Sequence, residues 1–230
     1  MSMLLSKYTR FFVFGILGVL VLLCGCKSAE IEQQIVAHLR IINASPTYAT
    51  YNVYVDGTKV NNSGALPLGG TVSFLLLSPG THEVKFTAGS NTTPILTQSL
   101  SLERDKVYSI YLLGSGNTLE AFVVHDESSI TSDTKAVVKF LNLSPDAGAL
   151  DLAIKGGADL AKGVNYKENS AYIATDAKKQ TLEIKDASGN VLASFDTEFF
   201  VGRFYTIISS GFVHPGADDR AFGGQSIEHR

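Results

Sequence analysis

The run His125-Asp126-Glu127 comes closer to a metal site than any other group of side chains in this sequence. An imidazole beside two carboxylates can ligate a transition metal. The run ends an alternating apolar stretch that is typical of a strand, so we expect a solvated strand end there instead. Asp218-Asp219, in a glycine-rich loop, lacks the spaced oxygen ligands of a calcium loop and is also expected to be solvated. We predict neither a metal nor another cofactor.

A pair of carboxylates, Asp146 and Asp151, flanks the turn after Pro145 and could support acid–base catalysis. The sequence has no Gly-x-Ser-x-Gly elbow, no His-Glu-x-x-His motif and no phosphate loop. We therefore predict a protein that has no catalytic residues and is not an enzyme. A hydrolase whose site lies in the second half of the chain is the alternative.

Both cysteines, Cys24 and Cys26, lie at the start of the chain, so the remainder has no thiol for a disulfide, a zinc site or a nucleophile. Lys7 and Arg10 come before an apolar, uncharged stretch over residues 11–23. A basic start followed by a short apolar stretch is the pattern of a secretory signal. The stretch is short for a spanning helix, which needs about 20 residues.

The leader ends in Leu23-Cys24-Gly25-Cys26, which resembles a bacterial lipobox. We predict cleavage between Gly25 and Cys26, a diacylglycerol on the Cys26 sulfur and an acyl group such as palmitate on its amine. Several acyl chains hold a protein stably in a membrane, because each buried CH₂ contributes about 0.8 kcal/mol. The predicted location is the outer membrane, on its periplasmic or cell-surface face. An ordinary signal peptide or anchor is the alternative.

Charge argues against nucleic acid as a partner. Removal of the leader takes away two basic residues and lowers the formal net charge from −3 to −5. Binding to phosphates needs clustered Lys and Arg, and no basic stripe follows the leader.

The chain repeats itself. Residues 39–46 match residues 138–145, and residues 107–110 match residues 204–207 at a nearly equal spacing. Two copies are too few for a solenoid, so each copy should have its own core. In the first repeat, Thr47 and Asn52 occupy the positions of Asp146 and Asp151, so no catalytic pair is duplicated.

Within each repeat the hydrophobic period is two, as in His82-Glu83-Val84-Lys85-Phe86, and turn residues follow at short intervals. We predict an all-β fold of two tandem β-sandwich domains after an N-terminal signal segment. The expected boundaries are 1–25 for the signal peptide, 26–35 for a polar tether, 36–126 for the first domain, 127–135 for a linker and 136–230 for the second domain.

Each first strand leads into Asn-x-Ser-Pro, where Pro46 and Pro145 should end the strand and the asparagine should bond nearby backbone. With the later Ser-Pro-Gly-Thr turn, this pattern resembles the domain-of-unknown-function family 4397. Residues 38–125 resemble it well and residues 137–213 in a divergent form. The resemblance implies an immunoglobulin- or transthyretin-like sandwich in envelope proteins, and no activity or ligand.

Two tyrosines are the candidate ligand-binding residues. Tyr48 lies in a predicted loop, and Tyr54 has the opposite parity to Tyr51, whose parity points to the core. Exposed tyrosines can stack on sugars or anchor a protein partner. The alternative, which residue burial in general favours, is that they cover a sheet face or cap the sandwich. We predict a non-enzymatic envelope lipoprotein that binds, adheres or displays. Its partners would be the membrane, through the lipid, and an envelope protein or a glycan.

Overall fold

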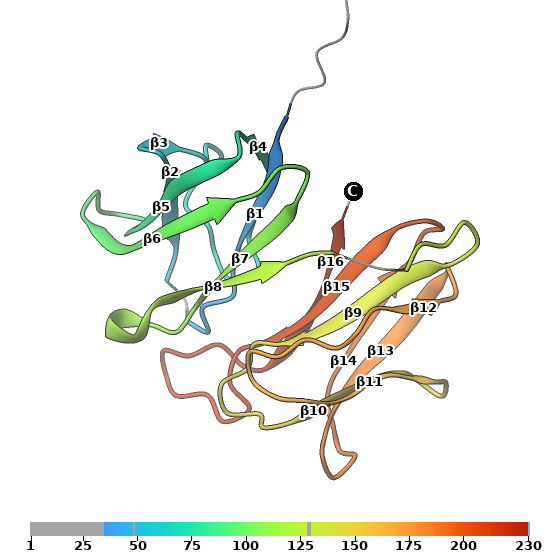
Figure 1. Cartoon of the computed structure of the whole chain (residues 1–230). Coiled ribbons are helices and arrows are strands. Elements are labelled where there is room, and N and C mark those ends of the chain that lie inside the picture. Colours follow the sequence, from blue (N-terminus) through green and yellow to red (C-terminus); the bar gives the residue numbers. More distant parts are fainter. Residues whose placement is uncertain (1–34, 48, 128–129, 230) are drawn as a thin grey trace, which may run out of the picture. The chain divides into compact units, whose positions relative to one another are not determined.

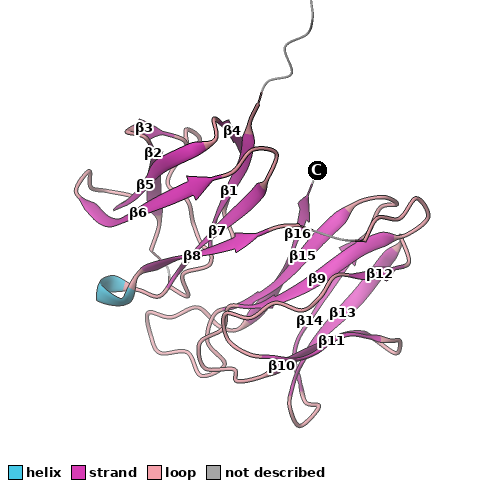
Figure 2. Cartoon of the chain, in the orientation of Figure 1, coloured by secondary structure: helices cyan, strands magenta, loops and turns pink. Residues whose placement is uncertain are grey.

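The described part of the chain is built almost entirely of strands and loops (Figure 2). The computed structural model describes residues 35–47, 49–127 and 130–229. The predicted signal peptide, Cys26 with most of its tether, and Tyr48 lie outside the described residues. Within the described residues, no helix has the length and apolar character needed to cross a membrane.

The first repeat folds into two four-stranded sheets, with strand orders β4-β1-β7-β8 and β3-β2-β5-β6 (Figure 1). Strands β1 and β7 run parallel, and the other pairs are antiparallel. The elements are β1 (Ala37–Asn43), β2 (Tyr51–Val55), β3 (Thr58–Lys59), β4 (Thr71–Leu77), β5 (Gly80–Ala88), β6 (Pro94–Leu102), β7 (Val107–Leu113), the 3₁₀ turn η1 (Gly116–Thr118) and β8 (Glu120–His125).

The second repeat has the same topology, with strand orders β12-β9-β15-β16 and β11-β10-β13-β14. Here β9 and β15 form the parallel pair. The predicted all-β fold of two sandwiches is confirmed. The elements are β9 (Ala136–Asn142), β10 (Leu150–Ile154), β11 (Asp159–Val164), β12 (Ile173–Thr175), β13 (Lys179–Asp186), β14 (Val191–Glu198), β15 (Phe204–Ser210) and β16 (Gly223–His229).

Each sandwich has its own core, and the period of two explains which side chains fill it. Val84 and Phe86 on β5 are fully buried in the first core, and Leu182 and Ile184 on β13 in the second. Alternate residues of a strand point to opposite faces, so the polar neighbours face away from the core. Burial of a side chain of this size stabilises the fold by about 1.5–3 kcal/mol relative to leaving it exposed.

The Asn-x-Ser-Pro segment ends the first strand of each sandwich as predicted. Asn43 accepts a hydrogen bond from the Ser45 N–H (3.0 Å) and donates one to the Leu66 carbonyl (3.0 Å). Asn142 repeats both contacts, with the Ser144 N–H and with the Val164 carbonyl. The asparagine thus bonds the backbone on both sides of the strand exit and fixes the direction of the chain where the strand ends.

The outer faces of two sheets are also buried, because the sandwiches pack against each other there. All seven residues of β9 are buried, as are six of the seven in β1. Residues that point away from their own cores form a third cluster, which we call the seam. Its buried apolar members are Ile42, Ala44, Tyr111, Leu113 and Val124 from the first sandwich, and Leu141, Leu143, Ile208 and Ile227 from the second.

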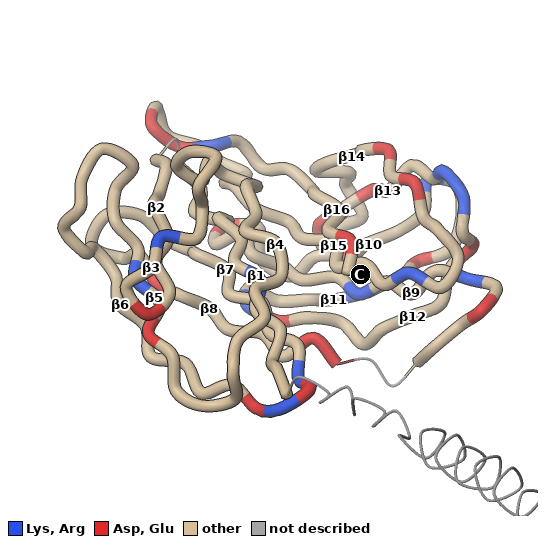
Figure 3. Tube along the Cα trace, turned by 90° about the horizontal axis from the view of Figure 1, so that it is seen from above, with Lys and Arg blue, Asp and Glu red and all other residues tan. Residues whose placement is uncertain are grey.

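Acidic and basic residues are scattered over both sandwiches (Figure 3). Three charged residues are buried in the seam: Arg40, Asp126 and Lys139.

Candidate functional site

The two carboxylates considered for catalysis accept hydrogen bonds from backbone N–H groups. Asp146 accepts hydrogen bonds from the Val213 and His214 N–H groups, both at 2.9 Å. Burial alone would raise the pKa of Asp146, but these hydrogen bonds lower it overall, which makes this group a poor general acid. Asp151 accepts from the Gly163 N–H at 2.7 Å. Asp146 therefore holds a loop, Asp151 joins β10 to β11, and the pair gives no support to a hydrolase site.

The side chains of His125, Asp126 and Glu127 have different surroundings, and the expectation that the whole run is solvated is wrong. The His125 ring stacks on Tyr108 with ring centroids 5.0 Å apart, whereas the Asp126 carboxylate is buried in the seam. Among the residues that the structure describes, no three His, Cys, Asp or Glu side chains converge on one point. The sequence did not reveal this burial, because the ammonium that pairs with Asp126 comes from Lys139 on a strand of the other sandwich.

Of the two candidate tyrosines, the described residues include Tyr54. It is partly buried on β2, where the strand register places it opposite Lys59 on one side and Lys85 on the other. Tyr51 is buried in the first core, as its parity predicts. Tyr54 therefore lies on the outer face of its sheet.

The seam holds a buried ion pair at its centre. The Asp126 carboxylate accepts hydrogen bonds from the Lys139 ammonium and the Ser109 hydroxyl. The side chains of Lys139 and Asp126 are 2 % and 0 % exposed, so water does not screen this pair. A charge in such a place must be paired, because desolvation of an isolated charge costs several kcal/mol.

A second basic residue occupies the equivalent position of the first sandwich. The Arg40 guanidinium donates to the Glu228 carbonyl at 2.6 Å and lies 4.1 Å from the centre of the Phe74 ring. Lys139 similarly lies 5.0 Å from the centre of the Tyr172 ring. The basic side chain on the first strand of each repeat thus reaches the other repeat, Arg40 at β16 and Lys139 at the residue that follows β8.

The strand registers extend this equivalence. Ser109 pairs with Val124 in the first sandwich, and Thr206 pairs with Ile227 in the second. Asp126 and His229 each come two residues after these partners, so they occupy equivalent positions. The two faces therefore meet as in a two-fold symmetric dimer, in which the same patch is used on both sides. His229 breaks the symmetry of charge. Burial lowers the pKa of His229 to about 4, against an opposing effect of the Asp126 carboxylate and with smaller lowering effects from Arg40 and Lys139. The His229 Nε2 lies 2.7 Å from the Thr206 hydroxyl.

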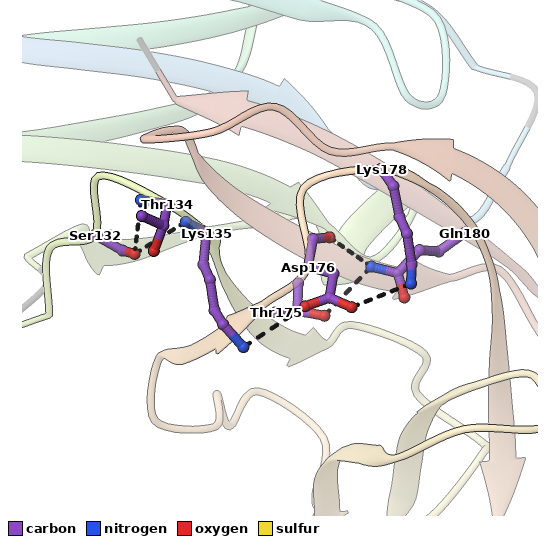
Figure 4. Close-up of polar contacts among 7 residues, drawn as sticks. All are labelled: Ser132, Thr134, Lys135, Thr175, Asp176, Lys178 and Gln180. Carbon is purple, nitrogen blue, oxygen red and sulfur yellow. Dashed lines mark hydrogen bonds and ion pairs between the residues drawn. The ribbon is translucent and has the colours of Figure 1, made fainter.

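A cleft of about 630 Å³ opens at the end of the second sandwich where β13 begins and β12 ends. Asp176 lies between Lys178 (3.1 Å) and Lys135 (3.6 Å), and the Gln180 amide donates to the Asp176 carbonyl at 2.7 Å (Figure 4). Ser132 accepts hydrogen bonds from the Lys135 and Thr134 N–H groups there. These contacts join the end of the linker to the β12–β13 turn. The cleft can present ammonium groups to an acidic or polar partner.

Known structures resemble the chain weakly. The Bacillus anthracis TIE protein is 14% identical with a TM-score of 0.26 over 78% of this chain, which spans about a third of that protein (34%). A family 26 carbohydrate-binding module of Eubacterium rectale Amy13K, in complex with maltoheptaose, is 9% identical with a TM-score of 0.26, covering 85% of this chain and 96% of that one. Streptococcal family 41 carbohydrate-binding modules, described as recognising alpha-glucan, are 12% identical with a TM-score of 0.25. That match covers 81% of this chain and 96% of the other. No site or ligand is transferred from them.

No curated protein matches the chain significantly. A family model does match, once, over residues 37–153, which comprise the first sandwich and the first two strands of the second. The match covers half of the sequence and is described as a domain of unknown function, DUF4397. The chain belongs to the DUF4397 family.

Proposed function

We propose that the protein is a non-enzymatic binding or display module of the bacterial cell envelope, held on the outer membrane by a lipid on Cys26. The leader that ends in Leu23-Cys24-Gly25-Cys26 supports the anchor. We also propose that the second sandwich is a divergent copy of the DUF4397 domain, because its strand order repeats that of the first. Such a chain would present two sandwiches outside the cytoplasm to an envelope protein or a glycan.

The buried seam is the observation that carries a display role. The Lys139–Asp126 pair and the third apolar cluster fix one sandwich against the other. Loops from both therefore keep a constant spacing, which lowers the entropy lost when a partner contacts both at once. Two sandwiches on a free linker would lack this property.

The anchor is tested by membrane fractionation of cells that make the full chain. Replacement Cys26→Ser should move the protein from the membrane to the soluble fraction, because no acyl chain can be attached. The matched control is Cys24→Ser, which keeps the predicted acceptor and should stay in the membrane. A Cys26→Ser chain that remains membrane-bound would contradict the anchor.

Glycan binding is the second candidate, and it rests on Tyr54. This side chain is partly exposed on the outer face of β2 between two lysine positions, which gives an aromatic surface with polar neighbours. Sugar rings stack on such surfaces. Replacement of Tyr48 and Tyr54 by Ala should weaken retention on envelope glycans at least tenfold, with Tyr51 left intact to preserve the core. Unchanged retention would exclude this mode of binding.

A further inference from the structure

One turn occurs in both sandwiches with the same geometry. It precedes β7 in the first sandwich and β15 in the second. The Glu103 N–H donates to the Tyr108 hydroxyl at 3.2 Å, and the Phe200 N–H donates to the Tyr205 hydroxyl at 3.0 Å. In each turn the third residue has a left-handed backbone, at φ 59° for Asp105 and 73° for Gly202. The fold therefore makes the same demand on the backbone at both places.

The side chains on these two turns are opposite in character. The first turn reads Glu103-Arg104-Asp105-Lys106 and is wholly charged, whereas the second begins with Phe200-Val201. Phe200 and Val201 are 51% and 54% exposed. Among the large exposed apolar side chains of the described residues, they are the one adjacent pair. Because the first turn forms with charged residues, the fold itself does not require apolar residues at the tip of the second.

The apolar tip is held in its exposed position. Phe199 is buried, packs edge to face on Tyr205 at 4.8 Å, and donates its N–H to the Lys178 carbonyl at 3.2 Å. On the other side the Gly202 N–H donates to the Lys135 carbonyl at 3.0 Å. The tip is thus bound at both ends, to the segments that carry Lys178 and Lys135 (Figure 4), and these bonds hold it away from the core.

The surroundings of the tip contain both basic and acidic side chains. Lys135 and Lys178 share the single carboxylate of Asp176, and Arg203 lies 3.7 Å from Glu228. Long basic side chains can place their heads among lipid phosphates while neighbouring apolar groups enter the acyl boundary. An aromatic tip flanked by lysines suits that layered environment better than it suits water.

The tip also lies at the end where the chain enters the fold. Strands β1 and β9 both end near one pocket, which is lined by Pro46 and Pro145, so both strands begin at the opposite end of the molecule. Because β15 runs parallel to β9, the turn before β15 also lies at that opposite end. Ile35 precedes β1 there, and residues 27–34 separate it from Cys26. Eight residues span no more than about 30 Å. A bilayer that holds a lipid on Cys26 is therefore within reach of this end.

We propose that the Phe200-Val201 tip inserts into the interface of the phospholipid bilayer to which the chain is anchored, and so orients the double sandwich on the membrane. The inference rests on the proposed lipid anchor. It predicts that the second sandwich approaches the bilayer with its turn before β15, while the charged turn of the first sandwich stays in water.

The sequence makes this measurable, because it contains no Trp and residues 26–230 contain a single cysteine. The mature chain, residues 26–230, is coupled through the Cys26 thiol to a maleimide lipid in phosphatidylethanolamine–phosphatidylglycerol vesicles. Coupling replaces natural lipidation, so the result does not depend on whether cells acylate Cys26. Single reporters Phe200→Trp and Val201→Trp are compared with Glu103→Trp, which occupies the equivalent place in the charged turn.

The tip reporters should show blue-shifted emission and at least twofold stronger quenching by spin-labelled lipids than the Glu103→Trp control. Water-like emission from both tip reporters would overturn the insertion and leave the anchor standing. Equal quenching of all three reporters would also overturn it, since the apolar turn would then have no special role. A blue shift that grows with protein concentration in the absence of vesicles would show that the tip contacts a second copy of the chain. That result would overturn the proposal that the tip inserts into the bilayer.

Discussion

At the scale of single residues, the seam depends on one carboxylate. Asp126 balances Lys139 at a place with almost no solvent. Removal of one partner from a buried pair leaves an uncompensated charge, which typically costs 3–5 kcal/mol. Asp126 therefore has a larger effect on stability than an exposed aspartate such as Asp133.

We expect Asp126→Ala to lower the free energy of unfolding in urea by about 3–5 kcal/mol. Asp133→Ala, at an exposed position, should change it by less than about 0.5 kcal/mol. The double variant Asp126→Leu/Lys139→Met should recover most of the loss, because replacing both charges removes the need for pairing. Equal effects of the two alanine variants would show that the seam is not a buried interface in solution.

His229 should make the seam sensitive to acid. Its pKa in the folded chain is lowered to about 4, chiefly by burial, from an ordinary value of 6.5. The folded state then binds fewer protons than the unfolded state, so the stability this group contributes is complete above pH 6.5 and is lost as pH falls to 4. The loss is on the order of 3 kcal/mol, since one pKa unit corresponds to 1.36 kcal/mol. Urea titrations at pH 7 and pH 4.5 should show it, and His229→Gln should reduce the difference.

His82 provides a control of opposite sign. Burial lowers its pKa, but hydrogen bonds to the Asp56 carboxylate (2.6 Å) and the Ser78 carbonyl (2.8 Å) raise it overall. The stability from His82 is therefore complete below pH 6.5 and is lost as pH rises. His82→Gln should weaken the fold more at pH 5.5 than at pH 8, and the reverse order would contradict the assignment.

At the scale of elements, the sequence predicted most of the fold. Alternation marked β5 and β13, and the repeated Asn-x-Ser-Pro marked the ends of β1 and β9. Arg40 and Lys139 were not recognised as buried, because a basic residue within a strand has the same appearance whether its face meets water or another sheet. The exposed Phe200-Val201 pair was missed too, although comparison with Glu103-Arg104 in the other repeat would have found it.

The asparagines at the strand ends should contribute strongly to the stability of the fold. Asn142 makes four hydrogen bonds, to the Ser144 N–H, the Gly148 and Val164 carbonyls and the Ser209 hydroxyl. Asn142→Ala leaves buried backbone groups unsatisfied, at about 1–3 kcal/mol each. We expect a loss of about 3 kcal/mol or more in thermal or urea unfolding, against almost none for the exposed Asn169→Ala. A loss below 1 kcal/mol would mean that water replaces these contacts.

At the scale of the whole molecule, three buried clusters rather than two hold residues 35–229 together. The seam should therefore keep the sandwiches joined without the linker. A protease site inserted within residues 127–135 and then cleaved should leave a 1:1 complex of the two halves in size-exclusion chromatography with light scattering. The same cleavage in the Asp126→Ala chain should release them. Separation of the wild-type halves would show that the linker, and not the seam, sets their spacing.

The contacts that Arg40 and Lys139 make across the seam restrict how the two repeats can change in sequence. Each half of the chain supplies the partner for a buried charge on the other half. A change at position 126 is then tolerated only with a compensating change at position 139, even though the two residues belong to different repeats. Among descendants of this duplication the paired positions should drift together, whereas solvent-facing neighbours such as Glu83 and Lys85 are free to vary independently of the other repeat.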